Sequence, residues 1–248
     1  MTSLPALLTR VAGRRNPCLT WYSEDERVEL SGFVLANWVT KTTHLLVDEL
    51  DVGPGRPVRV DLPAHWRGLV WSLAALRAGG TLVDHGPAAV VTDDPERWPD
   101  AADLVVVALP ALARTAGSVP PGAIDANAAV MTYPDRPGAW APAPADGLAL
   151  AEAEVRHAEL VDWATARAGW VHAGARVLAA GADPRDLLAV TLAALASDGS
   201  VVLGNAEWAA TMLADRERRA RLVESERVDV NLLPDDPDRG APGAGGRA

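Results

Sequence analysis

The sequence is poor in cysteine, in lysine and in aromatic residues other than tryptophan. Its 248 residues include one cysteine, Cys18, one phenylalanine and two tyrosines, and Lys41 is the only lysine. A single thiol can form neither an internal disulfide nor a multi-cysteine metal cluster, which excludes the disulfide-rich secreted class. Any chemistry that needs a lysine amine must use Lys41.

Long apolar runs and excess positive charge are also absent. No stretch approaches the ~20 apolar residues of a membrane-spanning helix, and residues 1–10 lack the regions of a signal peptide. The net charge is −10 and the pI is about 4.9. Such an acidic chain repels nucleic-acid phosphates. We therefore expect a cytoplasmic protein that binds neither membranes nor nucleic acids.

Hydrophobic residues make up 49% of the chain, which is enough for a folded core. Short valine-rich runs, typical of strands buried on both faces, alternate with segments of helical periodicity. Strands are predicted at 19–22, 58–62, 81–83, 88–92, 104–109, 176–180 and 200–203. Helices are predicted from the cap Ser31 to Leu50, and at 66–78, 152–168, 184–196 and 207–223.

Two breaks interrupt this alternation. Residues 118–146 are rich in proline and predict a long surface loop, with 130–133 as a candidate strand. From residue 234 the composition changes to Pro, Gly, Ala, Asp and Arg, which predicts a disordered tail over 234–248.

An internal repeat has an offset of 119 residues, which aligns Gly55 with Gly174 and Val58 with Val177. The segments 73–76 and 192–195 match, as do 80–83 and 199–202. Each copy is a strand, a helix, a glycine and a strand, the βαβ pattern of parallel sheets. We interpret the repeat as a duplication that forms two related layers or two halves of one sheet. Chance similarity of Leu/Ala-rich helices is the alternative.

The first copy and the segment before it resemble the N-terminal region of adenylate-forming enzymes, which include acyl-CoA synthetases, luciferases and peptide-synthetase adenylation domains. The matching residues are Leu19-Thr20-Trp21, Leu30, Leu46, Leu50, Val52-Gly53-Pro54-Gly55, Val58, Leu62-Pro63 and the run from Leu73 to Gly80. Residues 174–203 resemble the segment that follows the phosphate loop in that family. The match also resembles a short actinobacterial group distantly related to AMP-binding enzymes.

This resemblance, which covers residues 17–205, implies an α/β fold with two βαβ-containing, mainly parallel sheet layers and flanking helices. It implies a truncated N-terminal domain over 1–233, with halves at about 17–117 and 147–205. The family's adenine-binding motif, ribose-binding aspartate and mobile lid are expected beyond the end of this chain. Lys41 matches none of the family's lysines, so no catalytic residue is carried over.

The family's phosphate loop, "TSGTTGxPKG", corresponds in this comparison to residues 130–138. There Pro134 and Pro137 remove N–H donors, and Asp135 places negative charge where a phosphate would lie. Only Thr132 and Arg136 remain as candidate cofactor-binding residues. No cofactor is required by the sequence, and ATP or AMP is expected only if this degenerate site is retained.

Other polar groups give weaker signals. Asp84 and His85 follow a predicted strand. They form either an acid–base pair or a turn, and we favour the turn. The spacing of His44, His157 and His172 fits no metal motif, so no metal site is predicted. The tryptophans indicate buried packing, or a binding patch if they are exposed.

The sequence therefore favours a degenerate, non-catalytic relative of AMP-dependent acyl-CoA synthetases that binds a ligand or a protein. A second copy or another protein is expected to cover the surface left by the missing half. Two alternatives stay open: a nucleotide- or acyl-binding enzyme component completed by a partner chain, and a structural subunit. Whether the chain is an enzyme is left open, with the missing motifs favouring the negative.

Overall fold

The computed structural model describes residues 2–169, 172–181 and 183–234. Its helices are α1 (Leu4–Ala12), α2 (Gly32–Leu50), α3 (Trp66–Arg77), η1 (Pro95–Arg97), α4 (Ala126–Val130), α5 (Leu160–Arg167), α6 (Pro184–Ala196), α7 (Ala206–Ala214) and α8 (Arg216–Ser225). Its strands are β1 (Pro17–Tyr22), β2 (Arg27–Ser31), β3 (Pro57–Asp61), β4 (Thr81–Leu82), β5 (Ala89–Thr92), β6 (Asp103–Val106), β7 (Ile124–Asp125), β8 (Leu148–Leu150), β9 (Val155–Arg156), β10 (Arg176–Ala180), β11 (Ser200–Gly204) and β12 (Val230–Asn231).

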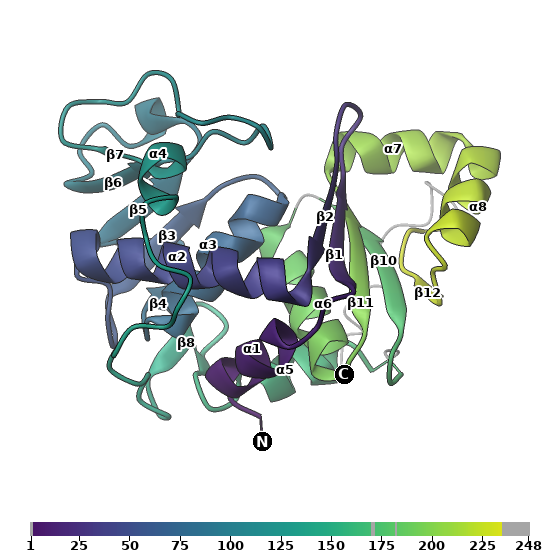
Figure 1. Ribbon diagram of the computed structural model, residues 1–248, viewed down its shortest axis with the longest axis horizontal. Helices are drawn as coiled ribbons and strands as arrows, with labels where there is room; N and C mark the ends of the chain where they lie inside the picture. The colour runs from purple at the N-terminus through teal and green to yellow at the C-terminus, as the bar shows by residue number, and fades with distance from the viewer. Residues whose placement is uncertain (1, 170–171, 182, 235–248) are drawn as a thin grey trace, which may run out of the picture.

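The described strands form two sheets (Figure 1). The 7-stranded sheet has the order β7-β6-β5-β3-β4-β8-β9, and the 5-stranded sheet has the order β12-β10-β11-β1-β2. Neighbouring strands are parallel except in the pairs β1–β2 and β8–β9. The predicted α/β fold class, with two mainly parallel layers, is confirmed.

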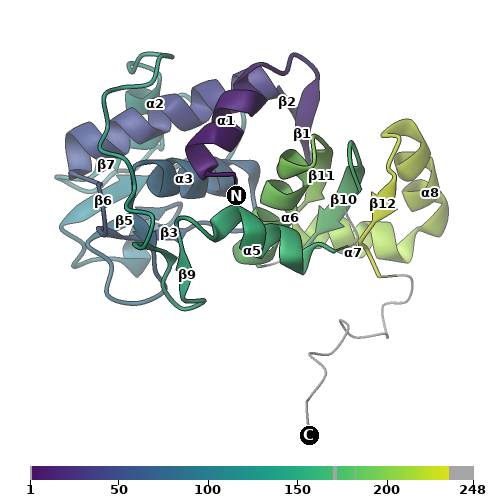
Figure 2. The same cartoon turned by 90° about the horizontal axis from the view of Figure 1, so that it is seen from below.

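Helices fill the space between the sheets and cover their faces. α3 packs on β3 and β4, α6 packs on β10 and β11, and the two helices contact each other. α2 crosses in front of α3 from the β1–β2 hairpin (Figure 1). α1 packs on α2, and α5 on α6 (Figure 2). One continuous core results, in which Leu19 and Val201 of one sheet and Val58 and Val91 of the other are all buried.

Local signals account for the starts of the long helices. The Ser31 side chain accepts a hydrogen bond from the Val34 N–H at 3.2 Å, so it caps α2 as predicted. Asp183 accepts from the Arg185 N–H at 2.8 Å, and Pro184 fills the first turn of α6. The observed β10 and α6 have the predicted bounds.

The repeat in sequence is also a repeat in structure. Pro57 pairs with Thr81 in the first βαβ unit, and Arg176 pairs with Ser200 in the second. These four residues correspond at the sequence offset, so both units have the same strand register. The two copies lie in separate sheets, which decides between the two arrangements left open by the sequence.

Three predicted elements are wrong in part. Residues 130–133 are not a strand, because the N–H groups of Thr132 and Tyr133 bond to helix carbonyls at 3.0 and 3.3 Å at the end of α4. The predicted helix 152–168 begins only at α5, because the preceding residues form the hairpin β8–β9. The predicted helix 207–223 is divided at Asp215, whose side chain caps α8. The predicted loop 118–146 contains β7 and α4, and the elements α1, β2, β8, β9 and β12 were also missed.

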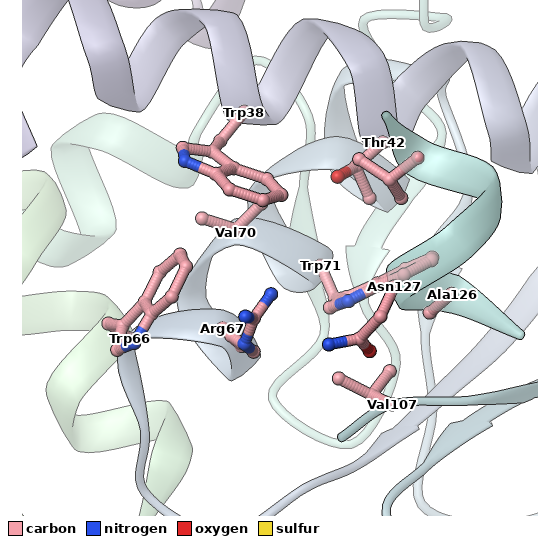
Figure 3. A pocket seen from close by; sticks show the side chains of 10 residues that line it. Trp38, Thr42, Trp66, Arg67, Val70, Trp71, Val107, Ala126 and Asn127 are labelled. Atoms are coloured by element: carbon pink, nitrogen blue, oxygen red, sulfur yellow. The ribbon is translucent and has the colours of Figure 1, made fainter. Parts of the chain in front are cut away.

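The tryptophans that the structure describes are buried or half-buried, so they form no exposed patch. Trp170 lies outside the described residues. Trp38, Trp66 and Trp71 surround Arg67 beside a small cavity between α2, α3 and α4 (Figure 3).

The predicted halves 17–117 and 147–205 do not coincide with the two sheets. β1 and β2 belong to the sheet of the later strands, whereas β8 and β9 belong to the sheet of the earlier ones. Within the described residues, no helix is long and apolar enough to cross a bilayer. The predicted tail falls almost entirely outside the described residues.

Candidate functional site

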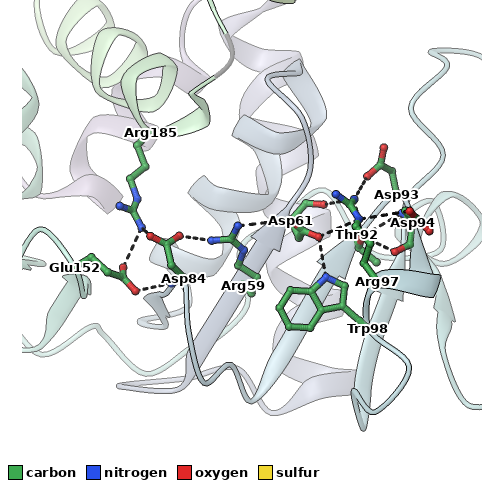
Figure 4. Close-up of polar contacts among 10 residues, drawn as sticks. All are labelled: Arg59, Asp61, Asp84, Thr92, Asp93, Asp94, Arg97, Trp98, Glu152 and Arg185. Atoms are coloured by element: carbon green, nitrogen blue, oxygen red, sulfur yellow. Dashed lines mark hydrogen bonds and ion pairs between the residues drawn. The ribbon is translucent and has the colours of Figure 1, made fainter.

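Parallel strands of the 7-stranded sheet end at a common edge, the place where open α/β sheets bind ligands. β8, β4, β3 and β5 are neighbours in this sheet. At or just beyond their carboxyl ends lie Glu152, Asp84, Asp61 and Thr92. Ion pairs and hydrogen bonds join these residues into a continuous row along the edge (Figure 4). We call it the strand-edge row.

Asp84 is the centre of one half of the strand-edge row. Arg59 on β3 and Arg185 on α6 each bind one of its carboxylate oxygens. The Asp84 N–H donates to Glu152 Oε1 at 2.6 Å, and Arg185 also binds Glu152 at 3.0 Å. Since α6 packs on the 5-stranded sheet, these contacts connect the two sheets.

Asp61 organises the other half. Trp98 Nε1 donates to its carboxylate at 2.7 Å, and Arg59 and Arg97 form ion pairs with it at 3.5 and 3.4 Å. Arg97 also binds Asp93 at 2.7 Å. Each arginine of the row therefore already has carboxylate partners, so the row presents no unpaired cation.

A crevice of about 260 Å³ opens between the row and the start of α6. Its polar groups are Arg59, Ser72, Asp84, Asp183 and Arg185. Its apolar walls are Val60, Leu62, Leu82, Val83, Pro184 and Leu188. The volume is close to the lower end for small-molecule pockets, which combine apolar walls with a few polar groups.

The turn 151–154, which closes the β8–β9 hairpin at this edge, is the position to compare with a phosphate loop. Such loops follow a strand and precede a helix, so that backbone N–H groups face the phosphate. Here the turn follows β8 and is followed by β9 and α5. Its sequence is Ala-Glu-Ala-Glu, with no glycine and no lysine. Glu152 instead brings a carboxylate, which already accepts from the Asp84 N–H and Arg185.

Known proteins resemble this arrangement over most of the chain. A scan against protein-family models finds no match. A TIGR03089 family protein of Mycobacterium tuberculosis (strain ATCC 25618 / H37Rv) is 33% identical over 205 residues, which cover 75% of this chain and 82% of that protein. The chain belongs to the TIGR03089 family.

Solved structures show that this TIGR03089 family member has the fold of adenylate-forming enzymes, as its sequence predicted. An acyl-CoA synthetase from Brucella canis has a TM-score of 0.69 at 17% identity, covering 92% of this chain and 46% of that one. A fatty acid AMP ligase from Legionella pneumophila has a TM-score of 0.63 at 13% identity, covering 93% of this chain and 44% of that one. The N-terminal domain of FACL13 from Mycobacterium tuberculosis has a TM-score of 0.63 at 14% identity, covering 93% of this chain and 62% of that one. The chain thus spans under two thirds of each structure, and these identities establish the fold alone.

Thr132 and Arg136, the residues predicted to bind a cofactor, lie in an exposed segment after α4 and not at the end of a strand. The Thr132 hydroxyl donates to the Ala129 carbonyl at 2.8 Å. The Arg136 carbonyl accepts from His44 Nε2 at 2.9 Å. Neither residue lines the crevice at Asp84. Their role in nucleotide binding stays a prediction.

Lys41 reaches the same segment from α2. Its ammonium group donates to the Tyr133 carbonyl and pairs with Asp135 at 2.7 Å. The segment therefore presents carbonyl and carboxylate oxygens to α2, a polarity that suits a cation and opposes a phosphate. Pro134 and Pro137 have no N–H to offset it.

The other candidate groups of this TIGR03089 chain are exposed, buried or bonded to other residues. His85 is exposed in a bend, and Asp84 binds arginines and not His85, which fits the turn interpretation. His65 Nδ1 accepts from the Arg67 N–H at 3.1 Å, and burial lowers the pKa of His65 to about 3, so it is neutral. Burial raises the pKa of the Cys18 thiol to about 11, which makes it a poor nucleophile. The described residues contain no cluster of three metal-ligating side chains.

Asp84 was identified from the sequence, whereas Arg59, Arg185 and Glu152 were missed. Arg185 follows the Asp183-Pro184 start of a predicted helix, and helix N-termini favour negatively charged groups, which was an available signal. Glu152 was hidden because residues 152–168 were assigned to one helix.

Proposed function

We propose that this chain is a non-catalytic relative of AMP-dependent acyl-CoA synthetases that acts by binding a ligand or a protein. The proposal is carried by Glu152, whose carboxylate takes the donors at the strand end that a phosphate would need. A triphosphate brings about four negative charges, and two neighbouring carboxylates, Glu152 and Asp84, would repel it.

The segment 130–138 supports the same conclusion. Its N–H groups at Thr132 and Tyr133 bond to α4, and its prolines have none. Its carbonyl and carboxylate oxygens are held by Lys41 and His44. Neither of the two candidate phosphate positions therefore offers a set of free donors like that of an active adenylating enzyme.

For the ligand we propose the crevice beside Asp84. Its apolar walls include Leu82 and Leu188, and its polar groups lie together at Arg59, Asp84 and Arg185. A small molecule with an apolar body and a polar end fits this distribution.

The test is ATP–pyrophosphate exchange with a panel of carboxylic acids, together with a thermal-shift titration against ATP–Mg²⁺, AMP, CoA and short acyl-CoAs. We expect no exchange and no shift with either nucleotide. A nucleotide that binds the native state would add about 2.7 kcal/mol at a hundredfold excess over Kd, an easily measured shift. Exchange, or a nucleotide shift that is lost in Thr132→Ala/Arg136→Ala, would overturn the proposal.

A matched pair of variants tests Glu152 itself. Glu152→Gln removes the charge that holds Arg185, whereas Glu154→Gln changes an exposed carboxylate of the same turn with no hydrogen-bond partner among the described residues. We expect pyrophosphate to bind Glu152→Gln more tightly than the wild type, and Glu154→Gln to match the wild type. If the two variants bound pyrophosphate equally tightly, Glu152 would not be the group that prevents phosphate binding at this turn.

We also propose a cytoplasmic location and pairing with a second copy or another protein. The support for pairing is that the likeness covers only part of each solved neighbour. Sedimentation over a wide concentration range tests self-association, and a strictly monomeric species would contradict it.

A further inference from the structure

The loop between β6 and β7 holds a leucine out in solvent. Leu112 is 92% exposed, the highest value among the large hydrophobic side chains that the structure describes. It lies at the tip of a turn in which the Ala113 N–H donates to the Pro110 carbonyl at 3.1 Å. A single exposed leucine is common on protein surfaces and needs no explanation by itself. What sets this one apart is the support beneath its backbone.

Buried polar side chains fix the loop on both sides of the turn. Arg67, only 6% exposed, donates to the three consecutive carbonyls of residues 109–111, each at 3.3 Å. Asn127 accepts from the Ala108 N–H at 2.9 Å and donates to the Ala113 carbonyl at 3.0 Å. The two side chains come from α3 and α4 (Figure 3). Because the loop is already ordered, binding through its tip costs little conformational entropy.

An open groove lies on the same sheet, beside β5. It has a volume of about 430 Å³, within the ~300–1,000 Å³ range of binding sites. Its apolar walls include Pro87, Val90, Trp98, Pro99 and Ala102. Its charged residues are Arg97, which already pairs with Asp93 at 2.7 Å, and Asp100. The groove therefore offers an apolar surface that can receive a leucine side chain.

The groove and the loop border the same small apolar cluster. Val90, Leu104 and Val106 form this buried cluster on β5 and β6, and Trp98 of the groove and Val119 of the loop both pack against it. Two features of one face can meet those of a second copy around a two-fold axis. Each copy then gives its loop and receives that of its partner.

The charges beside these two features are complementary. Arg114 is exposed two residues after Leu112, and Asp100 is exposed in the groove. Neither side chain has a hydrogen bond or an ion pair with another described residue. An arginine beside the leucine and an aspartate beside the groove attract each other across such a contact, which favours this orientation.

We propose that this surface pairs two copies of the chain. Leu112 of each copy enters the groove of the other, and Arg114 of each copy meets Asp100 of the other. The inference rests on the pairing put forward under the proposed function, and it names the partner and the surface. The competing interpretation is that the loop only closes the end of β6, in which case replacing Leu112 leaves the mass in solution unchanged.

Sedimentation velocity of the full chain over a wide concentration range measures the pairing. We expect a reversible dimer, and we expect Leu112→Ser to weaken it at least about thirtyfold, which corresponds to the ~2 kcal/mol of an interface hot spot. Met131→Ser is the matched control, since Met131 is 60% exposed and lies outside both the loop and the groove. It should associate like the wild type.

Mixing two variants tests whether the leucine and the groove meet each other. Leu112→Ser keeps its groove, whereas Ala102→Trp fills the groove with a large side chain and keeps its leucine. We expect a one-to-one pair in the mixture at concentrations where neither variant associates alone, because one contact remains intact. Circular dichroism checks that both variants are folded.

A charge exchange tests the orientation. Arg114→Glu should weaken the dimer by placing like charges together, and the double variant Arg114→Glu/Asp100→Arg should restore it. A strictly monomeric wild type would overturn both this inference and self-pairing in the proposed function. An association that Leu112→Ser leaves unchanged, or a mixture that stays monomeric, would overturn this surface alone.

Discussion

Glu226 shows how one carboxylate can hold several parts of the chain. It lies between α8 and β12 and accepts from Tyr22 Oη at 2.5 Å, from Arg27 at 2.9 Å and from Arg176. Burial alone would raise the pKa of Glu226, but these hydrogen bonds outweigh it and lower the pKa below its usual 4.5. Folding thus favours the ionised form.

We expect Glu226→Gln to lower the free energy of unfolding by about 1–3 kcal/mol at neutral pH. Because the folded pKa is depressed, this stabilisation is complete above the unfolded value and is lost as the pH falls through the folded one. Urea unfolding at several pH values should show the difference between variant and wild type shrinking below pH 4.5. A constant difference would contradict this. Glu29→Gln, which removes a half-exposed partner of Arg27, should cost less than about 1 kcal/mol.

Ser31 is the residue whose local role the sequence predicted most directly. Replacing it with alanine leaves the Val34 N–H without its partner and should cost about 1 kcal/mol. Thermal unfolding measures the effect, and Ser118→Ala, at an exposed loop position, is the matched control. Equal melting temperatures for the two variants would show that the cap contributes nothing.

At the scale of elements, the two βαβ units offer a comparison at equivalent glycines. A Cβ on Gly199 would lie 2.2 Å from the Ala175 carbonyl oxygen, a backbone atom that cannot move alone. A Cβ on Gly80 would meet Val52 Cγ1 at 3.0 Å and the Ala75 carbonyl oxygen at 3.1 Å.

We therefore expect Gly199→Ala to cost about 1–3 kcal/mol, as overpacking does, and Gly80→Ala to cost clearly less. Chemical denaturation of both variants in parallel measures the contrast. If Gly80→Ala cost more than Gly199→Ala, the backbone of the second unit would accommodate the added methyl group more easily than the Cβ distances indicate.

The elements that the sequence predicted well carry their own signals. β10 and α6 have a valine-containing apolar run, an Asp183 cap and a proline in the first turn, all within one short segment. The hairpin β8–β9 has no such local signal, and β8 joins the sheet by pairing with Leu82 of β4, which is far away in the chain. Tertiary contacts there override the helical propensity of the Ala/Glu-rich sequence.

The same difference explains the candidate site. Asp84 was found because it directly follows a predicted strand. Arg59 on β3 and Arg185 on α6, a helix that packs on the other sheet, meet at Asp84 only after both layers have packed. The spacing of residues along the chain does not show which of them lie close together in the fold, so the strand-edge row could not be predicted from the sequence.

At the scale of the whole molecule, the shared core predicts cooperative unfolding. Leu19 and Val201 of one sheet belong to the same buried cluster as Val58 and Val91 of the other. Far-UV circular dichroism and tryptophan fluorescence should therefore give a single urea transition with coincident midpoints. Two separate transitions would show that the sheets unfold independently.

The placement of β1 beside β11 has a consequence for the order in which the protein is made. Leu19 pairs with Val201, so β1 leaves the ribosome long before β11, the strand that it joins in the sheet. The 7-stranded sheet, complete by β9, has all its strands available much earlier. During synthesis the N-terminal hairpin therefore keeps an unpaired edge, the kind of surface on which chaperones act and nascent chains aggregate.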